Sequence, residues 1–229
     1  MATAYEYRSN LQSTNVLHYR EALAAWSAGN LIDVFPSNGK RTNIVIANVS
    51  GHDMEAHGHT RYLRHAIRTL AELHSPGNLL GWLNIAFQRR LADFATDGFA
   101  SLFLAEIQGR SLTYASSGHG LALLVHATGR HARLRLAGST LGVRAAARFK
   151  EKSIAITPGD WLVLGTDAIT KIQNAEGVAF GAIGVARSMF SAIKGGVDDP
   201  AAAILAGARA HGTDDSLIDA AVLCVRFPA

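Results

Sequence analysis

The sequence predicts an α+β fold, a four-layer αββα sandwich in which two antiparallel sheets are flanked by helix pairs. Two observations support this prediction. A pair of helical segments lies between strand-like segments, and a second helical pair precedes the last strand. Strands and helices do not alternate one by one, as they would in a parallel sheet, so we expect antiparallel sheets whose outer faces are covered by helices.

The first half of the chain carries one clear strand and two helices. Residues 42–49 (TNIVIANV) are rich in β-branched side chains and lie between glycine-containing segments, which predicts a strand. Apolar residues at helical spacing predict two helices after it, and the second begins at Ser75-Pro76, a capping residue followed by proline. The apolar faces are Leu63, Ala66, Ile67, Leu70 and Leu73 in the first helix, and Leu79, Leu80, Leu83, Phe87 and Leu91 in the second.

From residue 99 the hydrophobic period becomes that of strands. Short apolar runs alternate with Gly, Asn and Pro-Gly-Asp segments, and two helical segments and a closing strand follow. The predicted strands are 99–107, 111–115, 121–126, 132–136, 149–156, 161–165 and 220–227, and the predicted helices are 180–193 and 199–210.

The composition is typical of one globular domain over residues 1–229, with 48% apolar and 17% charged residues. The net charge of +4 comes from scattered basic residues with no run of five, so a nucleic-acid partner is not indicated. The N-terminus is too polar for a signal peptide, and no apolar stretch approaches the ~18 residues of a membrane helix. We therefore expect a cytoplasmic protein without membrane contact. Its single cysteine, Cys224, lies in an apolar run and should be a buried thiol.

Seven short motifs follow one another in a fixed order along most of the chain. They are GNLID at 29–33, NVSGH at 48–52, a helix with a Leu-Asn pair at 76–84, YASSGH at 114–119, LGV at 141–143, PGDWLVLGTD at 158–167 and NAEGVAFG at 174–181. Together they resemble the SpoIIE/RsbU family of bacterial serine/threonine phosphatases, within the metal-dependent type-2C phosphatase superfamily. The resemblance covers about residues 20–227.

This resemblance implies a fold and an activity. The fold is the sandwich predicted above. The activity is hydrolysis of phosphoserine or phosphothreonine, in which two Mg²⁺ or Mn²⁺ ions bridge and activate a water molecule. The implied partner is a phosphorylated STAS-domain anti-sigma antagonist, or a similar phosphoprotein, in a partner-switching pathway of the stress-response kind.

In that family four aspartates bind the metal ions. Carried over residue by residue, they fall on Asn30, Asn48, Asp167 and Ile218, so of these positions only Asp167 keeps its carboxylate. Asn30 and Asn48 could still offer amide oxygens or could simply stabilise turns, whereas Ile218 offers no ligand. The family's Thr-Asp-Gly-x-x-Glu motif here ends in Lys171, which places a cation where a carboxylate would stand.

The last of the four positions leaves two alignments open. One places Ile218 before Asp219. The other uses Asp214-Asp215, but then the closing strand would start five residues later than the pattern requires. The metal-ligand candidates are Asp167, Asp33, the backbone carbonyl of Val49 and Asp219.

Losing carboxylates should weaken metal binding strongly. Two unit charges about 4 Å apart interact by about 4 kcal/mol at an effective dielectric constant of about 20, and a divalent ion doubles this for each carboxylate. We therefore expect Mg²⁺ or Mn²⁺ to bind weakly if at all. The favoured hypothesis is a catalytically impaired domain that binds a phosphoprotein. The alternatives are an active phosphatase with a rearranged metal site, and a His-based metal site or small-molecule sensor on the same scaffold.

Histidines invite a different metal hypothesis. Imidazole and carboxylate groups are dense in residues 52–59, and His57, Arg61 and His65 share one helical face. An arginine between two histidines argues against a bound cation, so we favour a polar helix start. His119 is expected to be a hydrogen-bonded hairpin residue rather than a catalytic one.

Overall fold

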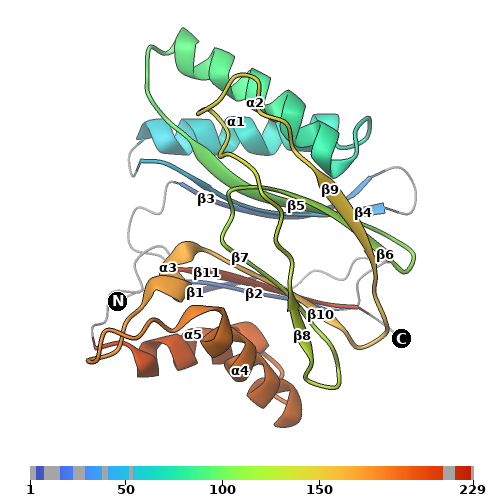
Figure 1. Cartoon of the computed structure of the whole chain (residues 1–229), viewed down its shortest axis with the longest axis vertical. Coiled ribbons are helices and arrows are strands. Elements are labelled where there is room, and N and C mark those ends of the chain that lie inside the picture. The colour runs from blue at the N-terminus through green and yellow to red at the C-terminus, as the bar shows by residue number, and fades with distance from the viewer. Residues whose placement is uncertain are drawn as a thin grey trace. The chain divides into compact units, whose positions relative to one another are not determined.

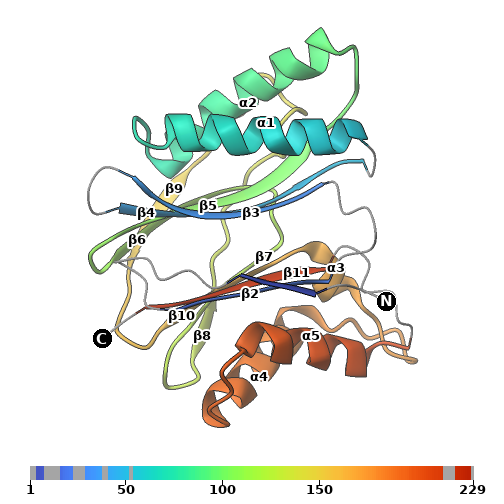
Figure 2. The same cartoon turned by 180° about the vertical axis from the view of Figure 1, so that it is seen from behind.

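The computed structural model describes residues 4–7, 16–22, 29–37, 41–51, 54–213 and 220–227. The chain divides into two compact units. The terminal unit comprises Met1–Ala25, Gly120–Leu134 and Thr157–Ala229, and the central unit comprises Trp26–His119 and Arg135–Ile156. Each unit contains one antiparallel sheet with helices against it (Figures 1 and 2). The predicted α+β class, with two antiparallel sheets that each carry a helix pair, is confirmed.

The central unit is a five-stranded sheet in the order β3-β4-β5-β6-β9, covered on one face by α1 and α2. The helices bury a stripe at helical spacing, such as Leu63 and Ile67 in α1 and Leu80 and Phe87 in α2, against the strands. The bounds are β3 Asn30–Ser37, β4 Arg41–Val49, α1 Met54–Leu70, α2 Pro76–Asp93, β5 Ala100–Gln108, β6 Ser111–Ser117 and β9 Glu151–Ala155.

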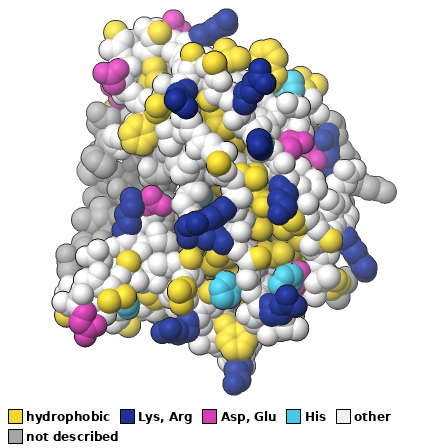
Figure 3. All heavy atoms as spheres, in the orientation of Figure 1, with side chains coloured by type: hydrophobic (Ala, Val, Ile, Leu, Met, Phe, Trp, Pro, Cys, Tyr) yellow, Lys and Arg dark blue, Asp and Glu magenta, His cyan; other side chains and the backbone are white. Residues whose placement is uncertain are grey.

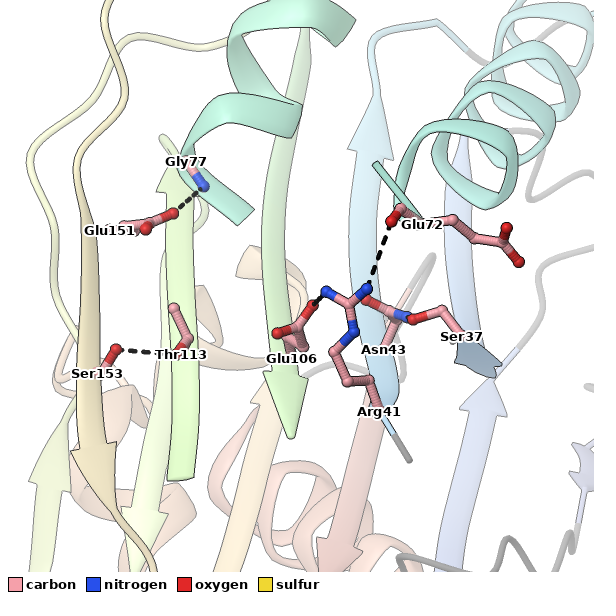
Figure 4. Close-up of polar contacts among 9 residues, drawn as sticks. All are labelled: Ser37, Arg41, Asn43, Glu72, Gly77, Glu106, Thr113, Glu151 and Ser153. Carbon is pink, nitrogen blue, oxygen red and sulfur yellow. Dashed lines mark hydrogen bonds and ion pairs between the residues drawn. The ribbon is translucent and has the colours of Figure 1, made fainter. Parts of the chain in front are cut away.

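Polar contacts join the helix pair of the central unit to its sheet (Figure 4). The guanidinium of Arg41 donates from Nη1 to Oε2 of Glu106 at 3.0 Å and from Nη2 to the carbonyl oxygen of Glu72 at 3.3 Å. At the first turn of α2, the backbone N–H of Gly77 donates to Oε2 of Glu151 at 2.8 Å. A carboxylate suits this place because the first N–H groups of a helix have no partner inside the helix.

The terminal unit is a six-stranded sheet in the order β1-β2-β11-β10-β7-β8. Helices α4 and α5 pack against it, and residues such as Met189 and Ile204 meet Leu123 and Val163 in one apolar cluster. The short helix α3 follows β10 directly. The bounds are β1 Ala4–Tyr7, β2 Val16–Ala22, β7 Leu121–Val125, β8 His131–Arg133, β10 Trp161–Gly165, α3 Asp167–Lys171, α4 Gly181–Lys194, α5 Pro200–His211 and β11 Ala221–Arg226.

Strand β3 was not predicted from the sequence. It contains Asn30, Asp33 and Pro36, residues that strands disfavour, but it forms the edge of its sheet, where proline is tolerated. The prediction for the first helix was too long at its C-terminal end. Helix α1 ends at Leu70, and Leu73 is 75% exposed in the turn that follows.

Among the described residues, no helix has the length and apolar character needed to cross a lipid bilayer.

Candidate functional site

The two asparagines at the family's acidic positions face each other on neighbouring strands. Asn30 begins β3 and pairs in register with Asn48 near the end of β4. The side-chain amide of Asn48 donates from Nδ2 to Oδ1 of Asn30 at 2.7 Å. Two carboxylates could not make this contact without a shared proton or a cation between them, whereas two amides supply both a donor and an acceptor.

The close approach of two backbones explains why the motif GNLID begins with glycine, Gly29. The backbone N–H of Val49 donates to the carbonyl oxygen of Gly29 at 2.8 Å. A side chain at Gly29 would overlap the carbonyl oxygen of Val49, so the two backbones approach as closely as they do only because Gly29 has no Cβ atom. The structure therefore brings Asn30, Asn48 and the backbone of Val49 to one end of the β3–β4 pair.

Asp33, which was also predicted to be a metal ligand, does not lie with this group. Residues of a strand alternate between its two faces, and Asp33 lies on the buried face with Leu31 and Phe35, opposite to Asn30. Both of its carboxylate oxygens accept hydrogen bonds from Arg68 of α1, at 2.7 Å each. The guanidinium of Arg68 also stacks over the ring of Phe35 at 4.9 Å. Asp33 thus links β3 to α1.

Asp167 lies in the terminal unit at the start of α3. Its neighbour Thr166 anchors this start, because the backbone N–H of Ala221 donates to Oγ1 of Thr166 at 3.0 Å. The Asp167 side chain is about half exposed, and its Oδ2 forms an ion pair with Nζ of Lys171, one helical turn later, at 3.0 Å. The other oxygen, Oδ1, lies over Gly120, where a Cβ atom would overlap it.

Arg133 was not singled out in the sequence. Its Nη2 donates to the carbonyl oxygen of Gly120 at 2.9 Å, so Gly120 contacts both Asp167 and Arg133. No sequence signal marks this arginine, because it is one scattered basic residue in a three-residue strand. Its position follows from the register of β8 with β7, in which Arg133 lies opposite Leu123.

Several other family motifs hold turns. The buried Asn84 of the Leu-Asn pair donates from Nδ2 to the carbonyl oxygen of Arg144 at 2.9 Å, and its Oδ1 accepts from the N–H of Gly142 at 3.0 Å. One side chain thereby joins two motifs that lie 58 residues apart. Asp160 of Pro-Gly-Asp is buried and accepts from the N–H of Thr157 at 3.0 Å.

Of the remaining predicted site residues, some form hydrogen bonds within the protein and others lie outside the described residues. The side chain of His59 is buried, with Nε2 3.3 Å from Oε1 of Glu55 and Nδ1 accepting from Nε of Arg90 at 2.9 Å, so both ring nitrogens have protein partners. The backbone N–H of His119 donates to Oγ of Ser116 at 3.3 Å. The following predicted site residues lie outside the described residues: His52, Asp53, Asp214, Asp215, Ile218 and Asp219.

A sequence profile of the SpoIIE family (Stage II sporulation protein E) matches residues 38–228. The chain belongs to the SpoIIE family. The family resemblance carried by the seven motifs is thereby confirmed. No curated protein sequence matches this SpoIIE-family chain at a significant level.

Solved structures agree with this SpoIIE-family assignment at the level of fold. The RsbU and RsbW domains of a Mycobacterium tuberculosis protein match with a TM-score of 0.76 and 20% identity, over 93% of this chain and 60% of that one. The SiaA PP2C domain of Pseudomonas aeruginosa matches with a TM-score of 0.74 and 17% identity, over 92% and 85%. RsbX in complex with magnesium matches with a TM-score of 0.67 and 14% identity, over 100% of both chains.

The SpoIIE-family fold implies divalent metal ions, but the described residues do not fit a two-metal centre. Magnesium and manganese prefer several oxygen ligands, with carboxylates supplying the charge. Here Oδ1 of Asn30 already accepts a hydrogen bond from Asn48, and Asp167 already pairs with Lys171. In the described part of the chain, no three His, Cys, Asp or Glu side chains come together in a group able to hold a metal ion.

Proposed function

We propose that this domain is a catalytically impaired SpoIIE-type phosphatase domain that acts by binding a phosphorylated partner. The hydrogen bond between Asn48 and Asn30 is the observation that supports impairment most directly. Two aspartates at these positions would repel each other and would need a cation between them. The two amides carry no charge and are joined by a hydrogen bond, so this end of β3 and β4 holds together without a cation and offers little attraction to a divalent ion.

The phosphoprotein partner is proposed from the family and from the preserved scaffold. The turn-forming contacts of Asn84 and Asp160 are intact, so the fold is retained although the carboxylates are lost. A Mycobacterium tuberculosis relative joins RsbU and RsbW domains in one chain, which supports a place in partner-switching signalling. The present chain spans 60% of that relative. We propose a phosphorylated STAS-domain protein as the partner and the cytoplasm as the location.

Phosphate release under metal-rich conditions tests the proposal. The protein is incubated with a serine-phosphorylated STAS protein and millimolar Mn²⁺, and free phosphate is measured over hours. We expect release at the level of the buffer control together with a stable complex by size-exclusion chromatography. Release that depends on Mn²⁺ and disappears in Asp167→Ala would overturn the proposal.

An active phosphatase with a rearranged metal site is the second candidate. It is favoured by the carboxylate of Asp167, which is about half exposed and therefore accessible. Asp219 or Asp214 would have to complete the site together with Asp167. Isothermal titration with Mn²⁺ separates the two candidates, because an active site of this kind requires binding at millimolar concentration or tighter.

A further inference from the structure

The outer side of helix α2 carries large apolar side chains that the fold leaves exposed. Trp82 is 53% exposed and Ile85 is 43% exposed, whereas Leu83 and Phe87 of the same helix are buried against the sheet. Trp82 and Ile85 lie three positions apart in the helix, so their side chains are neighbours and form one patch. Contiguous apolar surface of this kind marks an interaction site, which single scattered apolar residues do not.

The ring of Trp82 is held in place before any partner arrives. It stacks on the ring of His74, with the centroids 5.6 Å apart and an angle of 29° between the planes. His74 and Leu73, which is 75% exposed, belong to the turn between α1 and α2, so the patch continues onto this turn. A side chain that is already oriented loses less conformational entropy on binding. Close by, no atom lies within 4 Å of the Cβ position of Gly81, so the α2 backbone is open to a partner there.

A basic loop runs along α2 beside this patch. Asn84 of α2 holds the loop, because its side chain donates to the carbonyl oxygen of Arg144 and accepts from the N–H of Gly142. All of residues 135–150 are described, and they contain no acidic residue. Figure 3 shows hydrophobic and basic side chains mixed in its upper part, where Figure 1 places α2 and this loop. The cations of the loop are Arg135, Arg144, Arg148 and Lys150, and all four are exposed.

The outer side of α2 is itself free of acidic residues along most of its length. Between Glu72 and Asp93 the sequence contains none, and the exposed Arg89 follows Ile85 by one helical turn. In the described part of the chain, no carboxylate forms an ion pair with Arg89 or with the arginines of the loop. Of the residues of the central unit that are not described, Asp53 is the one acidic residue, and it directly precedes α1 in the sequence.

We infer that an acidic segment of a partner protein, with apolar side chains of its own, binds to this surface. The surface, called the α2 surface below, consists of Trp82, Ile85, Arg89, Arg144 and Arg148. Tryptophan and arginine are the residue types that contribute most binding energy at protein interfaces. The guanidinium groups select carboxylates, with which arginine forms two parallel hydrogen bonds, and the apolar centre accepts a hydrophobic side chain.

Two other occupants fit the α2 surface less well. A second copy of this chain would place arginines opposite arginines, and like charges across an interface oppose binding. A nucleic acid would satisfy the arginines through its phosphates, but this contact is made mainly by charge and would leave Ile85 without an apolar partner. Charge complementarity together with the apolar centre therefore favours an acidic protein segment.

The inference goes beyond the proposed function. The α2 surface lies on the side of the helix that faces away from the sheet, whereas Asn30 and Asn48 lie on strands of the sheet itself. A partner bound to the α2 surface therefore needs neither a metal ion nor a phosphoryl group.

Fluorescence anisotropy with a labelled model peptide tests the inference on the full chain. The peptide forms a helix with leucine and phenylalanine on one face and glutamates on both sides of that face. We expect Trp82→Ala and Ile85→Ala each to weaken its binding at least tenfold, which corresponds to about 1.4 kcal/mol. The double variant Arg144→Glu/Arg148→Glu should weaken it at least as much. A peptide with lysine in place of each glutamate should bind at least tenfold more weakly to the unchanged protein.

Exposed residues of the terminal unit provide matched controls. Ile183→Ala removes an isoleucine that is 71% exposed on α4, and Arg130→Glu/Arg187→Glu reverses two exposed arginines. Both variants should bind the peptide within twofold of the unchanged protein, and circular dichroism should show every variant folded. Equal losses in Ile183→Ala and Ile85→Ala would overturn the inference, and so would equal losses in the two charge-reversed variants.

Three further results would also overturn the inference. One is binding of a single-stranded oligonucleotide that is tighter than that of the peptide and is lost in Trp82→Ala. Another is dimerisation of the unchanged chain, measured by sedimentation, that is lost in Trp82→Ala, because a second copy would then cover the surface. The third is peptide binding that EDTA removes and Mn²⁺ restores. Release of phosphate from a phosphorylated STAS protein, in contrast, bears on the proposed function alone.

Discussion

Both carboxylate oxygens of Asp33 accept hydrogen bonds from the guanidinium of Arg68, and this pair joins the edge strand β3 to helix α1. The Asp33 side chain is 7% exposed and that of Arg68 is 50% exposed. Solvent therefore screens one side of the pair, while the carboxylate itself is largely removed from water. Asp33, the last residue of the opening motif, therefore has a structural partner in Arg68, on the face of the strand opposite to the asparagine pair.

Removing Arg68 should destabilise the protein by about 1–3 kcal/mol, because the buried carboxylate loses its charged donors. Urea unfolding followed by circular dichroism measures the change for Arg68→Ala. The double variant Asp33→Asn/Arg68→Ala should recover part of the loss, since the buried charge is gone. The control is Arg64→Ala, an exposed residue on the same helix, with an expected change within about 0.5 kcal/mol. Equal effects of Arg64→Ala and Arg68→Ala would contradict the structural role of the pair.

Restoring both family aspartates should create a metal-dependent stability. Without metal, Asn30→Asp/Asn48→Asp should lower the free energy of unfolding by about 1–4 kcal/mol, because one hydrogen bond is lost and two like charges face each other. Millimolar Mn²⁺ should raise the Tm of this variant and leave that of the unchanged chain in place. Asn78→Asp, an exposed change in α2, controls for added charge. A Tm shift of the same size in the unchanged chain would argue against the neutral pair.

Two glycine-to-alanine changes should have opposite signs. Gly29→Ala would drive a methyl group into the carbonyl oxygen of Val49 and should destabilise the protein by about 1–3 kcal/mol. Gly81→Ala lies inside α2 with no atom within 4 Å of the new Cβ, so it should stabilise the protein by about 0.5–1 kcal/mol. Thermal unfolding of both variants checks the signs. A neutral Gly29→Ala would mean that β3 and β4 can separate at this end without loss.

Cys224 should remain unreactive in the folded protein. Burial, and secondarily the negative charge of Asp199, raises the pKa of this thiol well above its ordinary value. The unfolded chain releases the thiol proton above pH ~8.5 and the folded chain does not, so stability should fall as the pH rises from there, by up to about 1.4 kcal/mol per pH unit. Ellman's reagent should label no thiol before unfolding, and Cys224→Ala should lack this part of the pH dependence. Rapid labelling of the folded chain would show that the thiol is reachable.

The sequence predicted those elements whose hydrophobic period is regular. Strand β4 and helix α2 are almost fully apolar on one face, and both appear where the period placed them. Strand β3 was missed because its polar residues and proline are tolerated only at a sheet edge, and the edge position is a property of the assembled sheet. The contacts of Asp33 and Arg133 could not be predicted from the sequence for a related reason. Their partners, Arg68 and Gly120, lie 35 and 13 residues away and are brought close only by strand register and helix packing.

The pairing of β2 with β11 affects how the protein is made on the ribosome. Residues 16–22 pair with residues 221–226, so the six-stranded sheet cannot form completely until residues 221–226 have been synthesised. The strands of the central unit, in contrast, have all been synthesised once residue 155 has emerged. Because domains fold as units during synthesis, the nascent chain should hold a formed central sheet while its N-terminal segment still lacks its partner strand. A truncation before the closing strand should therefore expose the apolar edge of β10 and recruit chaperones.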